Sequence, residues 1–151
     1  MNIISTEYIL NTKSLEIFVS GCKSPHCKGC CNPELWEFGS ENNYLEKFEE
    51  IKTKVKDYYI LIDNIILVGG CPLDQDHKEL VDLLEKLNTL NKKIFVFTKY
   101  ELGDIPYTIR RLCDYIKCGR YTPSLKTEDN IQYGIKLATS NQIIYKKNKD
   151  Y

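Results

Sequence analysis

The sequence lacks an excess of charge of either sign. Among its 151 residues, 21 are Lys or Arg and 21 are Asp or Glu, so the formal net charge is zero at pH 7. A neutral chain has no general electrostatic attraction to nucleic acid or to an anionic membrane surface. We therefore expect no direct binding of nucleic acid, and any partner has to be recognised locally.

Long hydrophobic runs are also missing. No stretch approaches the roughly 20 apolar residues that a membrane-spanning helix needs. The first seven residues do not combine a basic region with an apolar one, as a secretory signal peptide does. We expect a cytoplasmic protein that does not associate with a membrane.

Internal repeats, low-complexity tracts and linkers are absent as well. Apolar residues make up 42% of the chain, which is enough for one core at this length. Residues 1–151 are therefore predicted to form a single domain. Histidine is scarce, since His26 and His77 are the only two, and we assign neither of them a catalytic proton transfer.

Cysteine, by contrast, is frequent and clustered. Of the seven cysteines, Cys22, Cys27 and Cys30 lie in one loop with the spacing C-x4-C-x2-C. An odd number of cysteines in a reducing compartment argues against a disulfide scaffold. Three thiolates with this spacing, beside glycines that permit a tight backbone, are typical ligands of an iron–sulfur cluster. The three cysteines are therefore our predicted metal ligands, and they would leave one iron of a four-iron cluster without a protein ligand.

Structural zinc is the alternative for this loop, because zinc prefers tetrahedral thiolate sites. Adjacent Cys30 and Cys31 are poorly placed to bind one tetrahedral ion together, and only one knuckle is visible where zinc ribbons use two. We therefore favour the cluster and treat Cys31 as its neighbour.

Apolar runs alternate with amphipathic stretches, which predicts an α/β fold with a largely parallel sheet. The expected strands and helices follow one another along the chain: strand 15–20, helix 44–55, strand 64–68, a helix marked by leucines between 80 and 90, strand 93–98, a short helix 108–113 and strand 115–118. Residues 131–145 are expected to form a loop-rich or hairpin closing segment.

Several short motifs follow one another in a fixed order. They are the cysteine loop up to Trp36, Gly69-Gly70-Cys71-Pro72-Leu73, Thr98-Lys99-Tyr100, Cys118-Gly119-Arg120-Tyr121 and Ser140-Asn141-Gln142. Together they resemble the radical S-adenosylmethionine (SAM) superfamily, and within it the activating proteins of anaerobic ribonucleoside-triphosphate reductase. The resemblance covers about residues 14 to 145 and implies a small, incomplete TIM-type βα barrel of about five largely parallel strands.

The resemblance also implies cofactors and contacts. A 4Fe-4S cluster would be held by the three predicted ligands, and SAM would chelate its fourth iron. The residues expected near SAM are Cys31, Asn32, Gly69, Gly70, Cys71, Pro72 and Thr98. No further catalytic residue is implied.

Three positions depart from the family pattern. Cys71 stands where an acid is common, Lys99 replaces a glycine, and Cys118 replaces an aspartate. Neighbouring backbone carbonyls, Asp74 or Asp76 could compensate for the missing acid, or Cys71 could be a soft ligand near the cluster. The simplest interpretation of Cys71 is a small buried residue. Lys99 is expected either to reach a carboxylate or to point into solvent.

The function that the resemblance implies is reductive cleavage of SAM to a 5'-deoxyadenosyl radical, which generates a glycyl radical on a partner enzyme. The expected partner is the large subunit of anaerobic ribonucleotide reductase or another glycyl-radical enzyme, with flavodoxin or ferredoxin as electron donor. Two alternatives stay open: a radical SAM enzyme that acts on another protein or a small molecule, and a non-enzymatic zinc- or cluster-binding interaction module.

Overall fold

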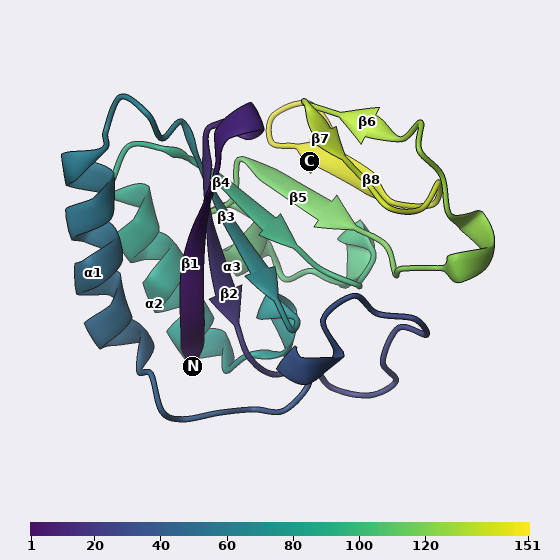
Figure 1. Cartoon of the computed structure of the whole chain (residues 1–151), viewed down its shortest axis with the longest axis horizontal. Coiled ribbons are helices and arrows are strands. Elements are labelled where there is room, and N and C mark those ends of the chain that lie inside the picture. Colours follow the sequence, from purple (N-terminus) through teal and green to yellow (C-terminus); the bar gives the residue numbers. More distant parts are fainter.

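A six-stranded, mostly parallel sheet forms the centre of the molecule. The computed structural model describes all residues, 1–151. The strands of the sheet are β1 (Ile3–Ile9), β2 (Ser14–Val19), β3 (Asn64–Gly69), β4 (Lys93–Phe97), β5 (Tyr115–Cys118) and β8 (Ile143–Lys146). They are arranged in the order β1-β2-β3-β4-β5-β8, in which β2 to β5 are parallel and the two outer strands are antiparallel to their neighbours (Figure 1).

Three α-helices connect the parallel strands: α1 (Tyr44–Asp57), α2 (His77–Asn88) and α3 (Tyr107–Arg110). A small hairpin of β6 (Ile131–Gln132) and β7 (Ile135–Lys136) precedes β8. The predicted α/β class and largely parallel sheet are confirmed, as are the expected strands and helices between β2 and β5. The sheet has six strands because β1 and β8 add an antiparallel strand at each edge. None of the helices has the length and hydrophobicity that a membrane span requires.

The main core lies between the sheet and the helices. Along β2, the buried Leu15, Ile17 and Val19 alternate with the half-buried Glu16 and Phe18, as a strand with one fully covered face requires. Helix α2 contributes its leucines to the same core, including Leu83 and Leu84, which are 0% exposed. This packing fixes the positions at which the parallel strands end.

The opposite face of the sheet is covered only in part. Ile66 and Phe95 pack there against Leu137 and Ile144 from the C-terminal segment. Nearer the carboxyl ends of the strands, the half-buried Phe18, Val68, Phe97 and Lys117 form one row across β2 to β5. This row lies at the same end of the sheet as the segments that follow the four parallel strands.

Candidate cluster-binding site

The cysteine loop connects β2 to α1, and the sheet fixes where it begins. The backbone N–H groups of Gly21 and Cys22 donate to the carbonyl oxygens of Leu35 and Trp36 at 2.8 and 2.9 Å. The carbonyl oxygen of Gly21 accepts a hydrogen bond from the N–H of Cys71 at 2.8 Å. These bonds close the loop on itself and attach it to the end of β3 (Figure 1).

Each of the three predicted ligand thiols accepts a hydrogen bond from a nearby donor. The Lys99 Nζ is 3.4 Å from the Cys22 Sγ, and the Arg120 Nη1 is 4.0 Å from the Cys27 Sγ. The backbone N–H of Asn32 donates to the Cys30 Sγ at 3.4 Å. All three cysteines are free. Donors to sulfur stabilise the charge of a bound thiolate or cluster. At Cys22, burial raises the pKa of the thiol, and the hydrogen bond from Lys99 offsets part of this rise.

Cys31 differs from its neighbours. It is exposed, and no side chain donates to its sulfur. Asn32 lies beside it and acts on Cys30 through its backbone, as described above. The contacts predicted between these two residues and SAM stay predictions.

Gly69 and Gly70 are required by close backbone packing. A Cβ on Gly69 would lie 2.3 Å from the carbonyl oxygen of Val19, and a Cβ on Gly70 would lie 2.3 Å from that of Gly21. Gly69 also has φ of +114°, a conformation that L side chains rarely adopt. The double glycine therefore brings β3 against the start of the cysteine loop, and its predicted contact with SAM stays a prediction.

Cys71 and Thr98 are buried together at the ends of β3 and β4. The Cys71 thiol, 1% exposed, is 3.2 Å from the Thr98 Oγ1. Burial raises the pKa of the Cys71 thiol, so the neutral form is favoured. Pro72 is buried and begins a short 3-10 turn. Contacts of these three residues with SAM are likewise predictions.

A buried ion pair joins the same region. The Lys99 Nζ lies 2.9 Å from the Asp74 Oδ2, with only 5% and 2% of the two side chains exposed. Tyr100 donates its hydroxyl to the other Asp74 oxygen, and the Lys23 N–H donates to Asp74 at 2.8 Å. Of the two expectations for Lys99, the structure supports the first, since the side chain reaches a carboxylate.

The contacts of the ion pair keep both Asp74 and Lys99 in their charged forms. Burial alone raises the pKa of Asp74, but the hydrogen bonds from Tyr100 and Lys99 outweigh burial, and the net pKa lies below its usual value. Burial lowers the pKa of Lys99, but the bond to Asp74 outweighs it, and the net pKa is raised. Asp74 is thus ionised and engaged within the protein. Asp76 caps α2 by accepting from the N–H of Glu79.

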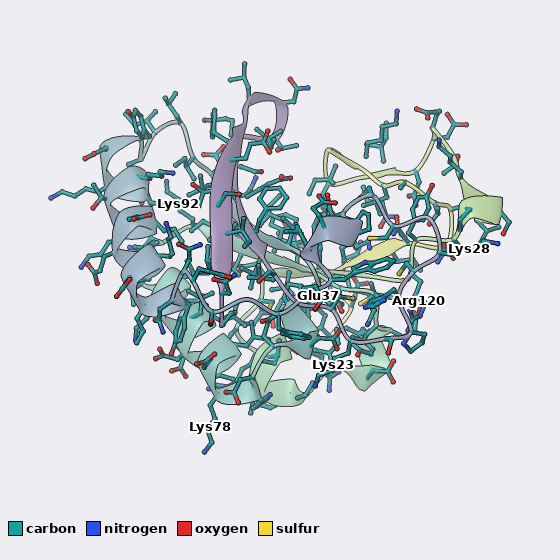
Figure 2. All side chains as sticks on the ribbon, turned by 60° about the horizontal axis from the view of Figure 1, so that its bottom comes forward. Lys23, Lys28, Glu37, Lys78, Lys92 and Arg120 are labelled. Atoms are coloured by element: carbon teal, nitrogen blue, oxygen red, sulfur yellow. The ribbon has the colours of Figure 1, made fainter.

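The Ser140-Asn141-Gln142 motif holds Arg120, and Arg120 contacts the cysteine loop. The Gln142 Nε2 donates to the carbonyl oxygen of Gly119 at 3.4 Å, and the Asn141 Nδ2 donates to that of Arg120 at 2.9 Å. Arg120, held in this way, donates to the carbonyl oxygen of Pro25 in the cysteine loop at 2.8 Å. Figure 2 shows Arg120 and Lys28 at this end of the molecule. The sequence contained the motif, but only the fold shows that it positions Arg120.

The two remaining cysteines are buried in the main core. Cys113 and Cys118 are 0% and 1% exposed, and burial raises the pKa of each thiol to about 12. The Cys113 Sγ donates to the carbonyl oxygen of Ile109 at 3.3 Å. Both are packing residues in this structure.

No group of three or more His, Cys, Asp or Glu side chains lies close enough to hold a single metal ion. Tetrahedral zinc needs four such ligands around one centre, so the arrangement gives no support to the zinc alternative. The thiolates of a cluster bind different iron atoms, and they need not converge on one point.

The residues present fit a 4Fe-4S cluster. The loop supplies three free thiols, each beside a hydrogen-bond donor. It also contains Trp36, whose Nε1 is buried without a hydrogen-bond partner and whose ring stacks on His26 at 4.0 Å. A buried donor of this kind is available to an acceptor bound in the loop.

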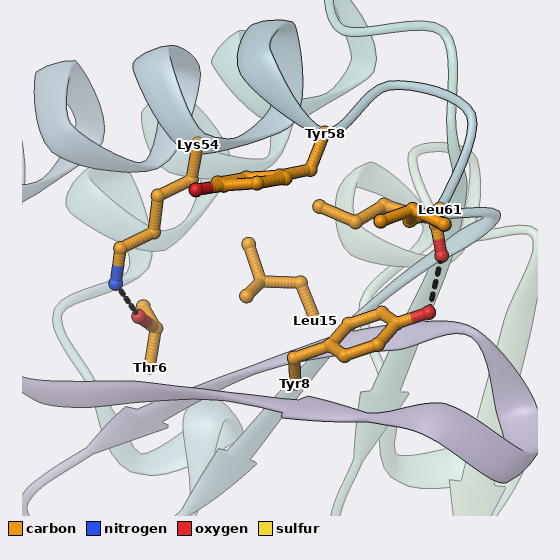
Figure 3. Close-up of a pocket in the computed structure, with 7 residues that line it drawn as sticks. Thr6, Tyr8, Leu15, Lys54, Tyr58 and Leu61 are labelled. Carbon is orange, nitrogen blue, oxygen red and sulfur yellow. Dashed lines mark hydrogen bonds between the residues drawn. The ribbon is translucent and has the colours of Figure 1, made fainter.

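A hollow at the other end of the sheet is separate from this site. It has a volume of about 340 Å³ and is lined mainly by apolar side chains near the amino ends of β2 and β3, including Tyr8, Tyr58 and Leu61 (Figure 3). It contains none of the cysteines, and the family motifs do not reach it.

Comparison with known proteins supports the interpretation of the cysteine loop. A family model described as a 4Fe-4S single cluster domain matches residues 13–145. No curated protein and no solved structure matches the chain. The match includes the cysteine loop and every strand from β2 to β5. The chain therefore belongs to the family of 4Fe-4S single cluster domains.

Proposed function

We propose that this protein is a radical SAM enzyme of the glycyl-radical activase type, with the three loop cysteines as the protein ligands of its cluster. When bound, the reduced cluster supplies the electron that cleaves SAM to methionine and a 5'-deoxyadenosyl radical. The target that we propose is a glycine of the large subunit of anaerobic ribonucleotide reductase.

One observation carries this proposal. The cysteine loop lies at the carboxyl edge of a parallel sheet, the edge at which α/β folds bind ligands, and it presents three free thiols with supporting donors. Three thiolates leave one iron of a four-iron cluster without a protein ligand. That iron is where the amino and carboxylate groups of SAM would bind.

The surroundings of the loop give the protein's own residues distinct tasks. Gly69 and Gly70 allow β3 to pack against Gly21. Lys99, which is paired with Asp74, donates to the Cys22 sulfur. The row of Phe18, Val68, Phe97 and Lys117 is only half-buried beside the loop. In our proposal this row belongs to the open inner side of an incomplete barrel.

A macromolecular substrate suits the partly covered face of the sheet. The C-terminal segment covers Ile66 and Phe95, whereas the row nearer the cysteine loop stays half-buried. A loop of a partner protein would cover the open side instead and exclude water from the radical. Flavodoxin or ferredoxin would supply the electron.

The proposal is tested with the anaerobically reconstituted full-length protein, a strong reductant, SAM and purified anaerobic ribonucleotide reductase. We expect methionine and 5'-deoxyadenosine as products, and a glycyl radical signal on the reductase by electron paramagnetic resonance. Cys27→Ala should abolish both, whereas Lys28→Ala, an exposed change in the same loop, should retain both. SAM cleavage without a glycyl radical would point to another target. A fully loaded protein that does not cleave SAM would be a non-enzymatic cluster module and would refute the proposal.

A further inference from the structure

Lys99 is a buried cation that contacts a predicted cluster ligand. Its Nζ is 3.4 Å from the Cys22 Sγ, and the residue is 8% exposed. Cys22 is itself buried, at 9% exposed. A positive charge at this distance from a sulfur, away from water, is screened much less than a charge on the surface.

The lysine is held in place by its other contacts. Besides Cys22, the ammonium group donates to Asp74 at 2.9 Å and to the carbonyl oxygen of Lys23. Asp74 is fixed in turn by Tyr100 and by the Lys23 N–H. Three acceptors satisfy the three donors of the ammonium group, so the side chain has one well-defined position and no unpaired proton that would draw it into solvent.

Other cations near the loop lack this arrangement. The side chain of Lys28 is exposed between Cys27 and Cys30. Arg120 reaches the Cys27 Sγ at the longer distance of 4.0 Å, and its residue is only half-buried. Lys117 is half-buried near the loop, but its Nζ donates to the carbonyl oxygen of Gly119. Lys99 is thus the buried cation that donates to a predicted ligand, and Lys28 offers an exposed control with the same charge.

We propose that Lys99 is a positioning residue that sets the reduction potential of the cluster, by donating a hydrogen bond to Cys22 and by holding a fixed positive charge beside it. The proposal rests on Cys22 as a cluster ligand. Reduction adds one negative charge to the site, so a nearby cation stabilises the reduced form more than the oxidised form. Hydrogen bonds to sulfur, net charge and solvent exposure are the factors by which proteins tune such clusters. Asp74 orients the lysine and offsets part of its charge.

The test is a redox titration of the reconstituted full-length protein, followed by electron paramagnetic resonance. We expect Lys99→Met to lower the midpoint potential enough to change the ratio of oxidised to reduced cluster at least tenfold at a fixed potential, which is about 59 mV for one electron. Lys28→Met removes the same charge from the exposed side of the loop and should change that ratio less than threefold. Lys99→Arg should restore most of the potential, whereas a purely structural lysine would leave the potential of every folded variant unchanged.

Asp74→Asn provides an opposite prediction. It removes the partially offsetting negative charge and should raise the potential. Lys99→Met leaves Asp74 buried without its partner, so the double variant Lys99→Met/Asp74→Asn, which removes both charges, tests the lysine if the single variant fails to fold. Its potential should lie below that of Asp74→Asn. Iron and sulfide content and circular dichroism establish that each variant is loaded and folded.

Two results would overturn the inference. One is an equal potential in Lys99→Met, Lys28→Met and the unaltered protein. The other is full iron content with an unchanged spectrum in Cys22→Ser, because Cys22 would then not be a ligand. Neither measurement uses SAM or a partner, so failure here is distinguishable from failure of the proposed function.

Discussion

At the scale of single residues, neighbouring cysteines have different surroundings. Cys22, Cys27 and Cys30 each accept a hydrogen bond at sulfur from another residue, while Cys31 is exposed and accepts none from another residue. The sequence predicted different roles for them, because adjacent Cys30 and Cys31 are poorly placed to bind one metal ion together, and the ligand set stays a prediction. The supporting donors were not predictable, since Lys99 and Arg120 reach the loop only through the folded sheet.

The different roles lead to a prediction about iron content. Cys27→Ala removes a predicted ligand and should reduce iron in the anaerobically reconstituted protein from about four per chain to less than half of that. Cys31→Ala should keep the full content, because its sulfur has no supporting donor. Iron and acid-labile sulfide assays measure both. Equal iron loss in the two variants would show that the ligand set is wrongly assigned.

Gly70 makes a second prediction. Alanine at this position places its Cβ 2.3 Å from the carbonyl oxygen of Gly21, and neither backbone segment can yield without disturbing the cysteine loop. We expect Gly70→Ala to lower the free energy of unfolding by about 2 kcal/mol and to weaken cluster retention. Gly103→Ala is the control, because nothing lies within 4 Å of its Cβ position. Its free energy of unfolding, measured with denaturant, should be nearly that of the unaltered protein.

At the scale of elements, the parallel strands were predictable and the outer strands were not. Strands β3 and β4 each contain a continuous apolar run, and β2 shows an alternating pattern, and both patterns predict strands. Apolar and polar residues do not alternate clearly from Ile3 to Ile9, so the sequence did not predict a strand there. In the structure this segment is the edge strand β1, and its register shifts between Ile3 and Ser5. Strand β8 was not predicted as a strand of the sheet, because its pairing with β5 is non-local. The sequence indicated only a loop-rich or hairpin closing segment there.

The same limit applies to the network beneath the loop. Asp74 and Lys99 are both visible in the sequence near strand ends, and a carboxylate partner for Lys99 was one of two expectations. Which one holds depends on how β3 and β4 are placed side by side. Single-sequence reasoning reaches the residue types in such a site, but their pairing needs the fold.

Strands β1 and β2 bring two carboxylates together and so predict a pH effect. Glu7 and Glu16 are directly paired, and burial, followed by repulsion from Glu7, raises the pKa of Glu16 above 4.5. The folded protein thus holds this proton more tightly than the unfolded chain does, so stability falls as pH rises from about the unfolded pKa through the raised folded value.

Glu16→Gln should remove this penalty. We expect a gain of about 0.5 kcal/mol in the free energy of unfolding at pH 7, and the gain should disappear below the ordinary glutamate pKa, where both chains are neutral at this position. Urea unfolding at several pH values measures it. Glu49→Gln, on the exposed face of α1, should show no such pH-dependent gain, and a gain at pH 7 that persisted at low pH would contradict the explanation.

At the scale of the whole molecule, the cysteine loop is the region that the cluster should stabilise most. Between β2 and α1 the chain forms only one 3-10 turn, Pro33–Leu35, and its folded shape depends on a few backbone bonds. A cluster that binds only the folded state stabilises that state. Anaerobic reconstitution should raise the midpoint of thermal unfolding by about 4 °C or more, as about 2 kcal/mol would at this chain length.

Hydrogen exchange should locate that gain. Amide protection on loading should increase mainly between residues 21 and 36, with little change in α1. A uniform increase over the chain, or no increase in the loop, would contradict a local effect of the cluster.

The position of Trp36 in the cysteine loop has an optical consequence. Trp36 is the only tryptophan of the chain, so all indole fluorescence comes from the cysteine loop. Iron–sulfur chromophores absorb broadly in the region where indole emits, and energy transfer to one bound in the loop should quench that emission. The protein thus has a built-in reporter, in which assembly and loss of the cluster in air can be followed as emission changes without an added dye.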